Sequence, residues 1–140
     1  MIEERIYIGE ISAEACWPIR QEVMWPDKGI DFVKLEKDES AIHYGLFLNQ
    51  KLSSIISLFI EKDQAQFRKF ATLKKEQGRG LGSKLLSFLL KEIEKYPVQR
   101  IFCNARIERL SYYEKFGLKK TKTVFEKAGR RCIIMEKHLN

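Results

Sequence analysis

The amino-acid sequence predicts a single α/β domain, of the α+β kind, with a mixed, mostly antiparallel sheet of about six to seven strands and helices on both faces. The chain has 140 residues, enough for one sizeable core, so we expect residues 1–140 to form one domain. Short alternating or apolar runs, typical of strands, recur along it, and residues 81–96 have the leucine spacing of an amphipathic helix. Because these segments follow one another in mixed order, the helices should cover the faces of one sheet.

The first forty residues are predicted to form a strand, a helix and a loop. Residues 5–9 alternate as in a short strand. Ser12 is a typical N-cap for a helix over residues 13–24, although Pro18 would delay the start of this helix or kink it. Residues 25–40 then form a turn cluster and a loop with one helical turn.

The rest of the chain alternates between strands and helices. Two apolar runs flank Asn49-Gln50-Lys51 and predict an antiparallel hairpin over residues 43–61. The later elements are a strand over residues 65–73, the leucine-rich helix stopped by Pro97, a strand over 98–103, a short helix over 108–116 stopped by Gly117, and two strands over 118–125 and 131–139.

The formal net charge of +7 is spread along the chain. Such a surface serves solubility or binds nucleic acid, an anionic membrane or an anionic small ligand. No clustered basic helix or aromatic RNA-binding motif supports nucleic acid, and no apolar run approaches the roughly 20 residues that span a bilayer. The three scattered cysteines and two distant histidines indicate neither a disulfide framework nor a metal site. The N-terminus lacks a secretory signal, so we expect a cytoplasmic protein.

Three glycines, Gly78, Gly80 and Gly82, stand at alternate positions just before the leucine-rich helix. Glycine is costly to order, so something requires bare backbone here. A helix N-terminus presents unpaired N–H groups and a partial positive charge, and glycines let a bulky anion approach them closely. A strand, a glycine-rich turn and a helix in this order therefore predict a phosphate-binding cradle, to which Arg79 and Lys84 add positive charge.

Two common phosphate-binding patterns do not fit the spacing of these glycines. A P-loop requires GxxxxGK[ST], but Gly82 follows Gly78 by only four residues and Ser83 separates it from Lys84. A dinucleotide-binding fold requires GxGxxG in a first strand–helix unit, whereas this GxGxG lies in the middle of the chain. The cradle is therefore of another kind.

Two motifs together resemble the GNAT family of acetyl-CoA-dependent N-acetyltransferases. The first, QGRGLG at residues 77–82, matches the pattern Q/R-x-x-G-x-G/A before a leucine-rich helix. The second, YYEKFGL at residues 112–118, is similar to the family's aromatic-Tyr-x-x-x-Gly-Phe segment, with Leu118 in place of phenylalanine. The motifs occur in the family's order, and the resemblance extends from Ile6 to His138. It implies a GNAT-like domain.

The resemblance implies acetyl-CoA as the cofactor. Its pyrophosphate would lie on the backbone N–H groups of the glycine loop. Its pantetheine arm would pair like an added strand with the end of the strand over residues 65–73, which must then splay away from the strand over 98–103. Matched by position, the implied cofactor-binding residues are Phe70, Ala71, Thr72, Gln77, Gly78, Arg79, Gly80, Leu81, Gly82, Ser83, Asn104 and Arg106. Arg106 replaces an asparagine found in many members, and nearby Asn104 is its candidate substitute.

Tyr113 is the catalytic residue that the resemblance implies. A phenol has a proton to give, so Tyr113 would protonate the thiolate that leaves when an amine attacks the thioester. The alternative is an aromatic residue that only packs, which is the expected role of Tyr112. Cys103 ends a predicted strand near the thioester, where it would serve either a covalent acyl-cysteine route or, as we expect, simple packing.

The acceptor side is implied to lie after the first strand and around the last hairpin. Candidate pocket residues there are Arg20, Trp25 and Tyr44, with an ordinary amphipathic helix and its stop as the alternative. His43 begins a predicted strand, and Glu61 is a candidate general base at the end of a hairpin strand. The candidate substrate residues are Arg20, Trp25, His43 and Glu61.

The expected activity is acetyl transfer to a primary amine by direct attack in a ternary complex, with a small-molecule acceptor. The alternatives are acetylation of a protein N-terminus or lysine, and an acyl-CoA-binding module without turnover. We expect no nucleic-acid or membrane partner and no metal, and allow for a homodimer.

Overall fold

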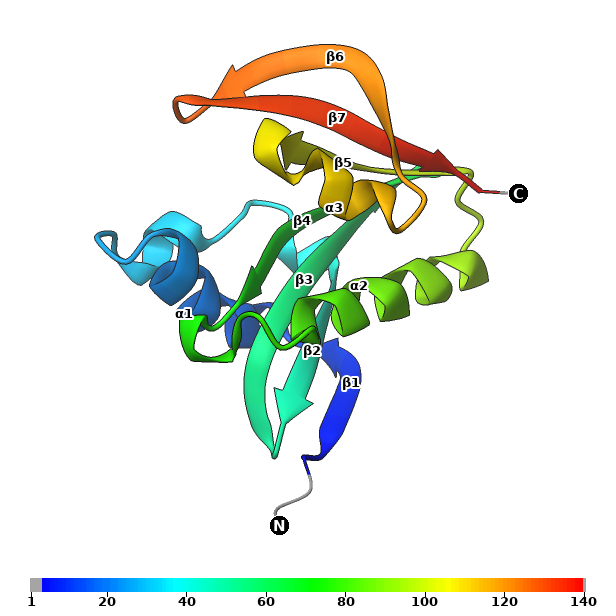
Figure 1. Cartoon of the computed structure of the whole chain (residues 1–140). Coiled ribbons are helices and arrows are strands. Elements are labelled where there is room, and N and C mark those ends of the chain that lie inside the picture. Colours follow the sequence, from blue (N-terminus) through cyan, green and yellow to red (C-terminus); the bar gives the residue numbers. More distant parts are fainter. Residues whose placement is uncertain (1–3, 140) are drawn as a thin grey trace.

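The computed structural model describes residues 4–139, which form one seven-stranded sheet in the order β1-β2-β3-β4-β5-β7-β6 (Figure 1). The strands are β1 Ile6–Ile11, β2 Ile42–Leu48, β3 Lys51–Glu61, β4 Gln64–Thr72, β5 Arg100–Arg106, β6 Lys119–Lys127 and β7 Arg130–His138. The α-helices are α1 Ala13–Met24, α2 Leu81–Glu92 and α3 Leu110–Glu114. None of the described helices is long and apolar enough to cross a membrane.

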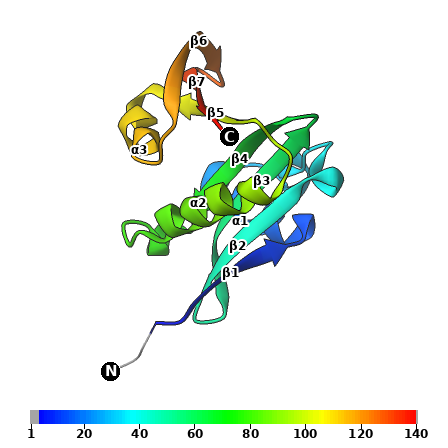
Figure 2. The same ribbon diagram turned by 90° about the vertical axis from the view of Figure 1, so that its right-hand side faces the viewer.

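The sheet is mixed, as predicted. Neighbouring strands from β1 to β4 pair antiparallel, as do β5 with β7 and β7 with β6. Among the strands within residues 4–139, only β4 and β5 pair in parallel. In Figure 2, β5, β7 and α3 stand away from β3 and β4, so this parallel pair joins two parts of the sheet.

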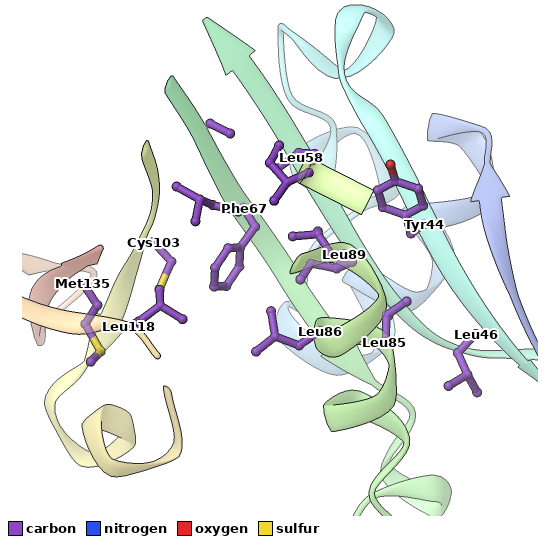
Figure 3. Close-up of a cluster of buried hydrophobic side chains, with 14 of the residues drawn as sticks. Tyr44, Leu46, Leu58, Phe67, Leu85, Leu86, Leu89, Cys103, Leu118 and Met135 are labelled. Atoms are coloured by element: carbon purple, nitrogen blue, oxygen red, sulfur yellow. The ribbon is translucent and has the colours of Figure 1, made fainter. Parts of the chain in front are cut away.

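Helices cover both faces of the sheet, which confirms the predicted architecture. The larger core lies under α2, whose leucines pack on β2, β3 and β4. In Figure 3, Leu86 and Leu89 lie on the side of Phe67 and Leu58, and Leu85 lies on the side of Tyr44 and Leu46. A smaller core lies under α1 on the other face and is built from residues that alternate with those of the larger one. Its buried members are Cys16, Ile19, Ile55, Ala71 and Leu73.

Helix α1 begins where its capping residue predicts. The hydroxyl of Ser12 accepts a hydrogen bond from the N–H of Ala15 at 3.2 Å, which satisfies one of the free donors of the first turn. Pro18 lies inside the helix and does not delay its start. The helix continues through Pro18, with Cys16 and Ile19 on either side of it buried against the sheet.

We expect Ser12→Ala to lower the free energy of unfolding by about 1 kcal/mol, because the variant leaves that N–H without its side-chain acceptor. Urea unfolding measures the change. Ser87→Ala, at an exposed position within α2, is the matched control and should leave stability unchanged or slightly higher. Equal midpoints for the wild type and Ser12→Ala would contradict this account of the helix start.

Several predicted boundaries shift by a few residues. The leucine-rich helix becomes a 3₁₀ turn after Glu92, and the predicted helix over 108–116 divides into a 3₁₀ turn over Ile107–Arg109 and α3. The strand predicted over 98–103 runs instead over Arg100–Arg106, because it pairs with β7 along that whole length. The loop over 30–40 holds two 3₁₀ turns, Ile30–Val33 and Asp38–Ser40, in place of one helical turn.

Candidate active site

The two strands that flank the predicted cofactor site separate after a short paired region. β4 and β5 pair only through residues 64–66 and 100–102, and beyond these β4 continues to Thr72 and β5 to Arg106 without pairing to each other. The predicted splay is therefore confirmed. It leaves unpaired backbone N–H and C=O groups along the facing edges of both strands, and an extended chain can hydrogen-bond to such an edge as an added strand.

A β-bulge interrupts β4 just beyond the point where the gap opens. Arg68 lies opposite Ser57 and Ala71 lies opposite Ile55, so β4 has one extra residue between these pairs. Lys69 adopts a φ of 56°, in the left-handed region. Bulges bend a strand and increase its twist, so this one contributes to the divergence of β4 from β5.

The glycine loop joins the end of β4 to α2 and leaves the helix N-terminus without a side-chain cap. The N-cap is Gly80, the first turn holds no acidic residue, and the first hydrogen bond within the helix runs from the N–H of Lys84 to the carbonyl of Gly80. The N–H groups of residues 81–83 therefore have no acceptor within the helix. Gln77 fixes the approach, since its side-chain amide donates to the carbonyl of Thr72 at 2.9 Å.

Two different structural requirements explain why glycine occupies these three positions. Gly78 and Gly80 have φ values of 80° and 78°, and a Cβ built on either meets no atom within 4 Å. A Cβ on Gly82 would instead lie 3.2 Å from the ring of Phe70 and 3.3 Å from the hydroxyl of Thr72. Gly78 and Gly80 thus provide an open, left-handed turn, whereas Gly82 lets α2 approach β4 closely. Free N–H groups beside open space fit a phosphate group.

Arg79 contributes less charge to the cradle than the sequence suggests. Its guanidinium is 2.6 Å from the carboxylate of Glu76 and also pairs with Glu4. These two carboxylates partly neutralise the arginine. Lys84 is exposed in the first turn of α2 and makes no salt bridge with any residue from 4 to 139.

Tyr113 lies beside the point where β4 and β5 separate. Its ring packs against Phe67 of β4, with centroids 5.9 Å apart, and against Tyr112, at 5.2 Å. Burial, together with nearby Cys103 of β5, raises the pKa of the Tyr113 phenol, so the phenol stays protonated at neutral pH. Within the described chain, no hydrogen bond occupies its hydroxyl. Tyr113 is thus a phenol with a proton available at the gap.

The other predicted residues of this region line its two sides. Tyr112 joins α3 to the first turn of α2, because its hydroxyl is 3.0 Å from that of Ser83. Asn104 and Arg106 are exposed on the part of β5 that pairs with β7 but not with β4. Cys103 is buried, and burial raises the pKa of its thiol to about 12. A thiol that stays protonated is a poor nucleophile, which favours packing over the covalent route.

Arg20 and His43 do not line an open pocket. Arg20 is 0% exposed, and its guanidinium forms a two-bond ion pair with Asp38 while also donating to Ser57 and to the carbonyl of Val33. His43 is also buried, and its ring nitrogens lie 2.7 Å from the hydroxyl of Ser57 and 2.8 Å from the carbonyl of Asp38. Both side chains therefore hold α1 and the following loop against β2 and β3.

Asp38 and Ser57 are the members of this network that sequence reasoning missed. Burial alone would raise the pKa of Asp38, but hydrogen bonds from Arg20, the Leu35 N–H and the Trp17 indole lower it. The sequence signal was weak: Ser57 is the one hydroxyl within the apolar run of residues 55–60, and such a residue needs a buried partner.

The remaining acceptor candidates lie apart from one another. Trp25 caps the C-terminus of α1 and packs edge-on against Phe32, with centroids 5.1 Å apart. Tyr44 is 2% exposed in the core under α2, so it cannot line a pocket. Glu61 is exposed at the end of β3 and lies 3.7 Å from the amine of Lys37. The structure does not bring these residues together with Tyr113.

Comparison with known proteins identifies the family. The model of the acetyltransferase (GNAT) domain matches residues 24–139, which is most of the chain. The protein therefore belongs to the GNAT acetyltransferases and is an acyltransferase.

A curated relative and two solved structures agree with this assignment. The uncharacterized N-acetyltransferase YitI of Bacillus subtilis (strain 168) is 30% identical over 128 residues, covering 85% of this chain and 86% of YitI. A putative N-acetyltransferase from Lactobacillus plantarum superposes with a TM-score of 0.82 at 21% identity, over 98% of this chain and 99% of that one. A GNAT family acetyltransferase from Elizabethkingia anophelis with acetyl-CoA bound superposes with a TM-score of 0.75 at 16% identity, over 96% of this chain and 98% of that one.

Proposed function

We propose that this protein transfers the acetyl group of acetyl-CoA to a primary amine by direct attack in a ternary complex, and that the acceptor is a small molecule. The observation that carries this proposal is the continuity of two features. An unpaired strand edge on β4 leads, through residues 73–80, into an uncapped helix N-terminus with two open, left-handed glycines. A ligand with an extended arm and a phosphate end matches both features at once.

The residues that would hold acetyl-CoA follow from this layout. The N–H groups of residues 78–83 suit its pyrophosphate, and the free edge of Phe70, Ala71 and Thr72 suits its pantetheine arm. Asn104 and Arg106 are exposed on the stretch of β5 that does not pair with β4, and they would provide further contacts for its polar groups. The chemistry that acetyl-CoA supplies is an activated thioester.

Tyr113 has the properties of the general acid. The amine nitrogen forms a bond to the thioester carbonyl carbon, the carbon–sulfur bond breaks, and the departing thiolate needs a proton. Tyr113 is protonated at neutral pH, unoccupied by other described residues and beside the gap. A positioned acid of this kind typically contributes about 10²–10⁴-fold in rate.

No side chain is assigned as the general base. Glu61 is exposed and lies near Lys37, and both ring nitrogens of His43 are held by Ser57 and the Asp38 carbonyl. The amine would therefore lose its proton to water before attack.

The test is amine-dependent release of the coenzyme A thiol, followed with a thiol reagent and checked by mass spectrometry of the acceptor. The panel should include small primary amines, free lysine and short peptides. We expect thiol release that requires both an amine and acetyl-CoA, with small amines preferred. Preference for peptides would favour the protein-acetylation alternative. Binding of acetyl-CoA without turnover of any amine would overturn the proposal in favour of a non-catalytic module.

A further inference from the structure

A group of cations lies on the face of β4 opposite Tyr113. Arg68 is paired in register with Ser57, whose hydroxyl bonds Arg20 and His43 under α1. Arg68 therefore faces α1, whereas Phe67 and Tyr113 face α2 and α3. The Arg68 guanidinium lies over the ring of Phe59, 5.5 Å from its centroid, and is half-buried.

Lys69 adds a second cation at the bulge. Its φ of 56° is uncommon for a residue with a side chain and sets it beside Arg68 within the gap-lining part of β4. Burial, followed by the charges of Arg68, Lys127 and Arg20, lowers the pKa of Lys69 to about 8, and Asp38 acts in the opposite direction. Asp38 is itself already paired with Arg20.

The third cation comes from the far end of the sheet. Lys127 ends β6, and the turn that follows it is exposed. In Figure 1 this turn lies above α1 and the loop between α1 and β2, and the charge of Lys127 acts on Lys69. Within residues 4–139, none of Arg68, Lys69 and Lys127 has a carboxylate within 4 Å.

We infer that the acceptor amine carries an anionic group, a carboxylate or a phosphate, which Arg68, Lys69 and Lys127 bind beside the gap between β4 and β5. The inference rests on the proposed function and specifies its acceptor. Three like charges repel one another when none of them has a described carboxylate within 4 Å, and an anionic ligand relieves that repulsion. The two substrates then meet at the gap from opposite faces, with the thioester arm on the side of α2 and the anionic amine on the side of α1.

The experiment compares matched amines that differ in one negative charge, at constant ionic strength. The pairs are L-glutamate with L-glutamine, L-aspartate with L-asparagine, phosphoethanolamine with ethanolamine, and short peptides that begin with Glu or Gln. The quantity measured is kcat/KM for acetyl transfer by the wild type, Arg68→Gln, Lys69→Gln and Lys127→Gln. Lys91→Gln removes the same charge from an exposed position on α2 and is the control.

We expect the anionic member of at least one pair to be preferred at least tenfold. Arg68→Gln and Lys69→Gln should lower kcat/KM for that anion at least tenfold, while changing the neutral partner less than threefold. Lys127→Gln, at an exposed position that cannot disturb the core, should shift the same ratio in the same direction. Lys91→Gln should change neither member.

Three outcomes distinguish a failure of the inference from a failure of the proposed function. Turnover of neutral amines without any anionic preference overturns the inference and leaves the proposed function intact. Stabilisation of the protein by acetyl-CoA without turnover of any anionic amine also overturns the inference. The absence of both stabilisation and turnover overturns the proposed function itself.

Discussion

Replacing Tyr113 with phenylalanine is expected to lower kcat by about 100-fold or more, while the affinity for acetyl-CoA stays within about threefold of the wild type. The substitution removes only the hydroxyl, and that hydroxyl has no hydrogen bond to another described residue. Packing against Phe67 and Tyr112 is therefore preserved. The loss should fall on the step in which the thiolate leaves, which steady-state kinetics at saturating acetyl-CoA measures.

Tyr112→Phe is the matched control for this experiment. It removes a neighbouring phenol whose hydroxyl contacts Ser83, so it should affect acetyl-CoA binding slightly and kcat by less than about tenfold. If Tyr113→Phe retained wild-type kcat, Tyr113 would be a packing residue and water would supply the proton.

The largest stability effect is expected from Asp38→Asn, at about 3–5 kcal/mol of lost unfolding free energy. The variant keeps the shape of the side chain but leaves the guanidinium of Arg20, which is 0% exposed, without its countercharge. Asp38 also accepts hydrogen bonds from the Trp17 indole and the Leu35 N–H, so the loop before β2 should loosen with it. Urea unfolding at neutral pH measures the change.

The pH dependence of this effect has a definite sign. The pKa of Asp38 is lower in the folded protein than in the unfolded chain, so its stabilisation is present above the unfolded value of about 3.9 and is lost as the pH falls below it. The difference between wild type and Asp38→Asn should therefore shrink in acid. Asp31→Asn breaks the exposed pair with Lys34 and should have no measurable effect at either pH. Equal losses of unfolding free energy for the two variants would show that the buried Arg20–Asp38 pair stabilises the protein no more than the exposed Lys34–Asp31 pair.

The fold and the glycine loop could be predicted from the sequence because each depends on local chemistry. The leucine spacing of α2, the cap at Ser12 and the turn glycines act within a few residues of themselves. The proposed function of the loop rests on the same local chemistry, since a helix N-terminus without a side-chain cap or an acidic first turn can be recognised from the residues around it. Gly82 is the exception. A side chain at this position would crowd Phe70 and Thr72, and the sequence alone does not show that these residues lie beside it.

The acceptor side could not be predicted in the same way because its contacts join distant parts of the chain. Arg20 was expected in a pocket, but its partners Asp38 and Ser57 come from a loop and a strand that are 18 and 37 residues away. The bulge at Lys69 depends on register with β3, and no residue type in the sequence marks it. Lys127 comes near Lys69 only through the folded sheet, because the two residues are far apart in the sequence.

The central claim is that acetyl-CoA binds on the glycine loop, and the thermal midpoint with and without acetyl-CoA tests it in the wild type, Gly80→Glu and Gly129→Glu. Gly80 and Gly129 have φ values of 78° and 76° and open space for a side chain, so the two variants carry the same strain and charge at different places. A ligand at 100 times its Kd stabilises the folded state by about 2.7 kcal/mol. We predict that acetyl-CoA raises the midpoint of the wild type and Gly129→Glu but not that of Gly80→Glu. No shift in the wild type, or an equal shift in all three proteins, would contradict the claim.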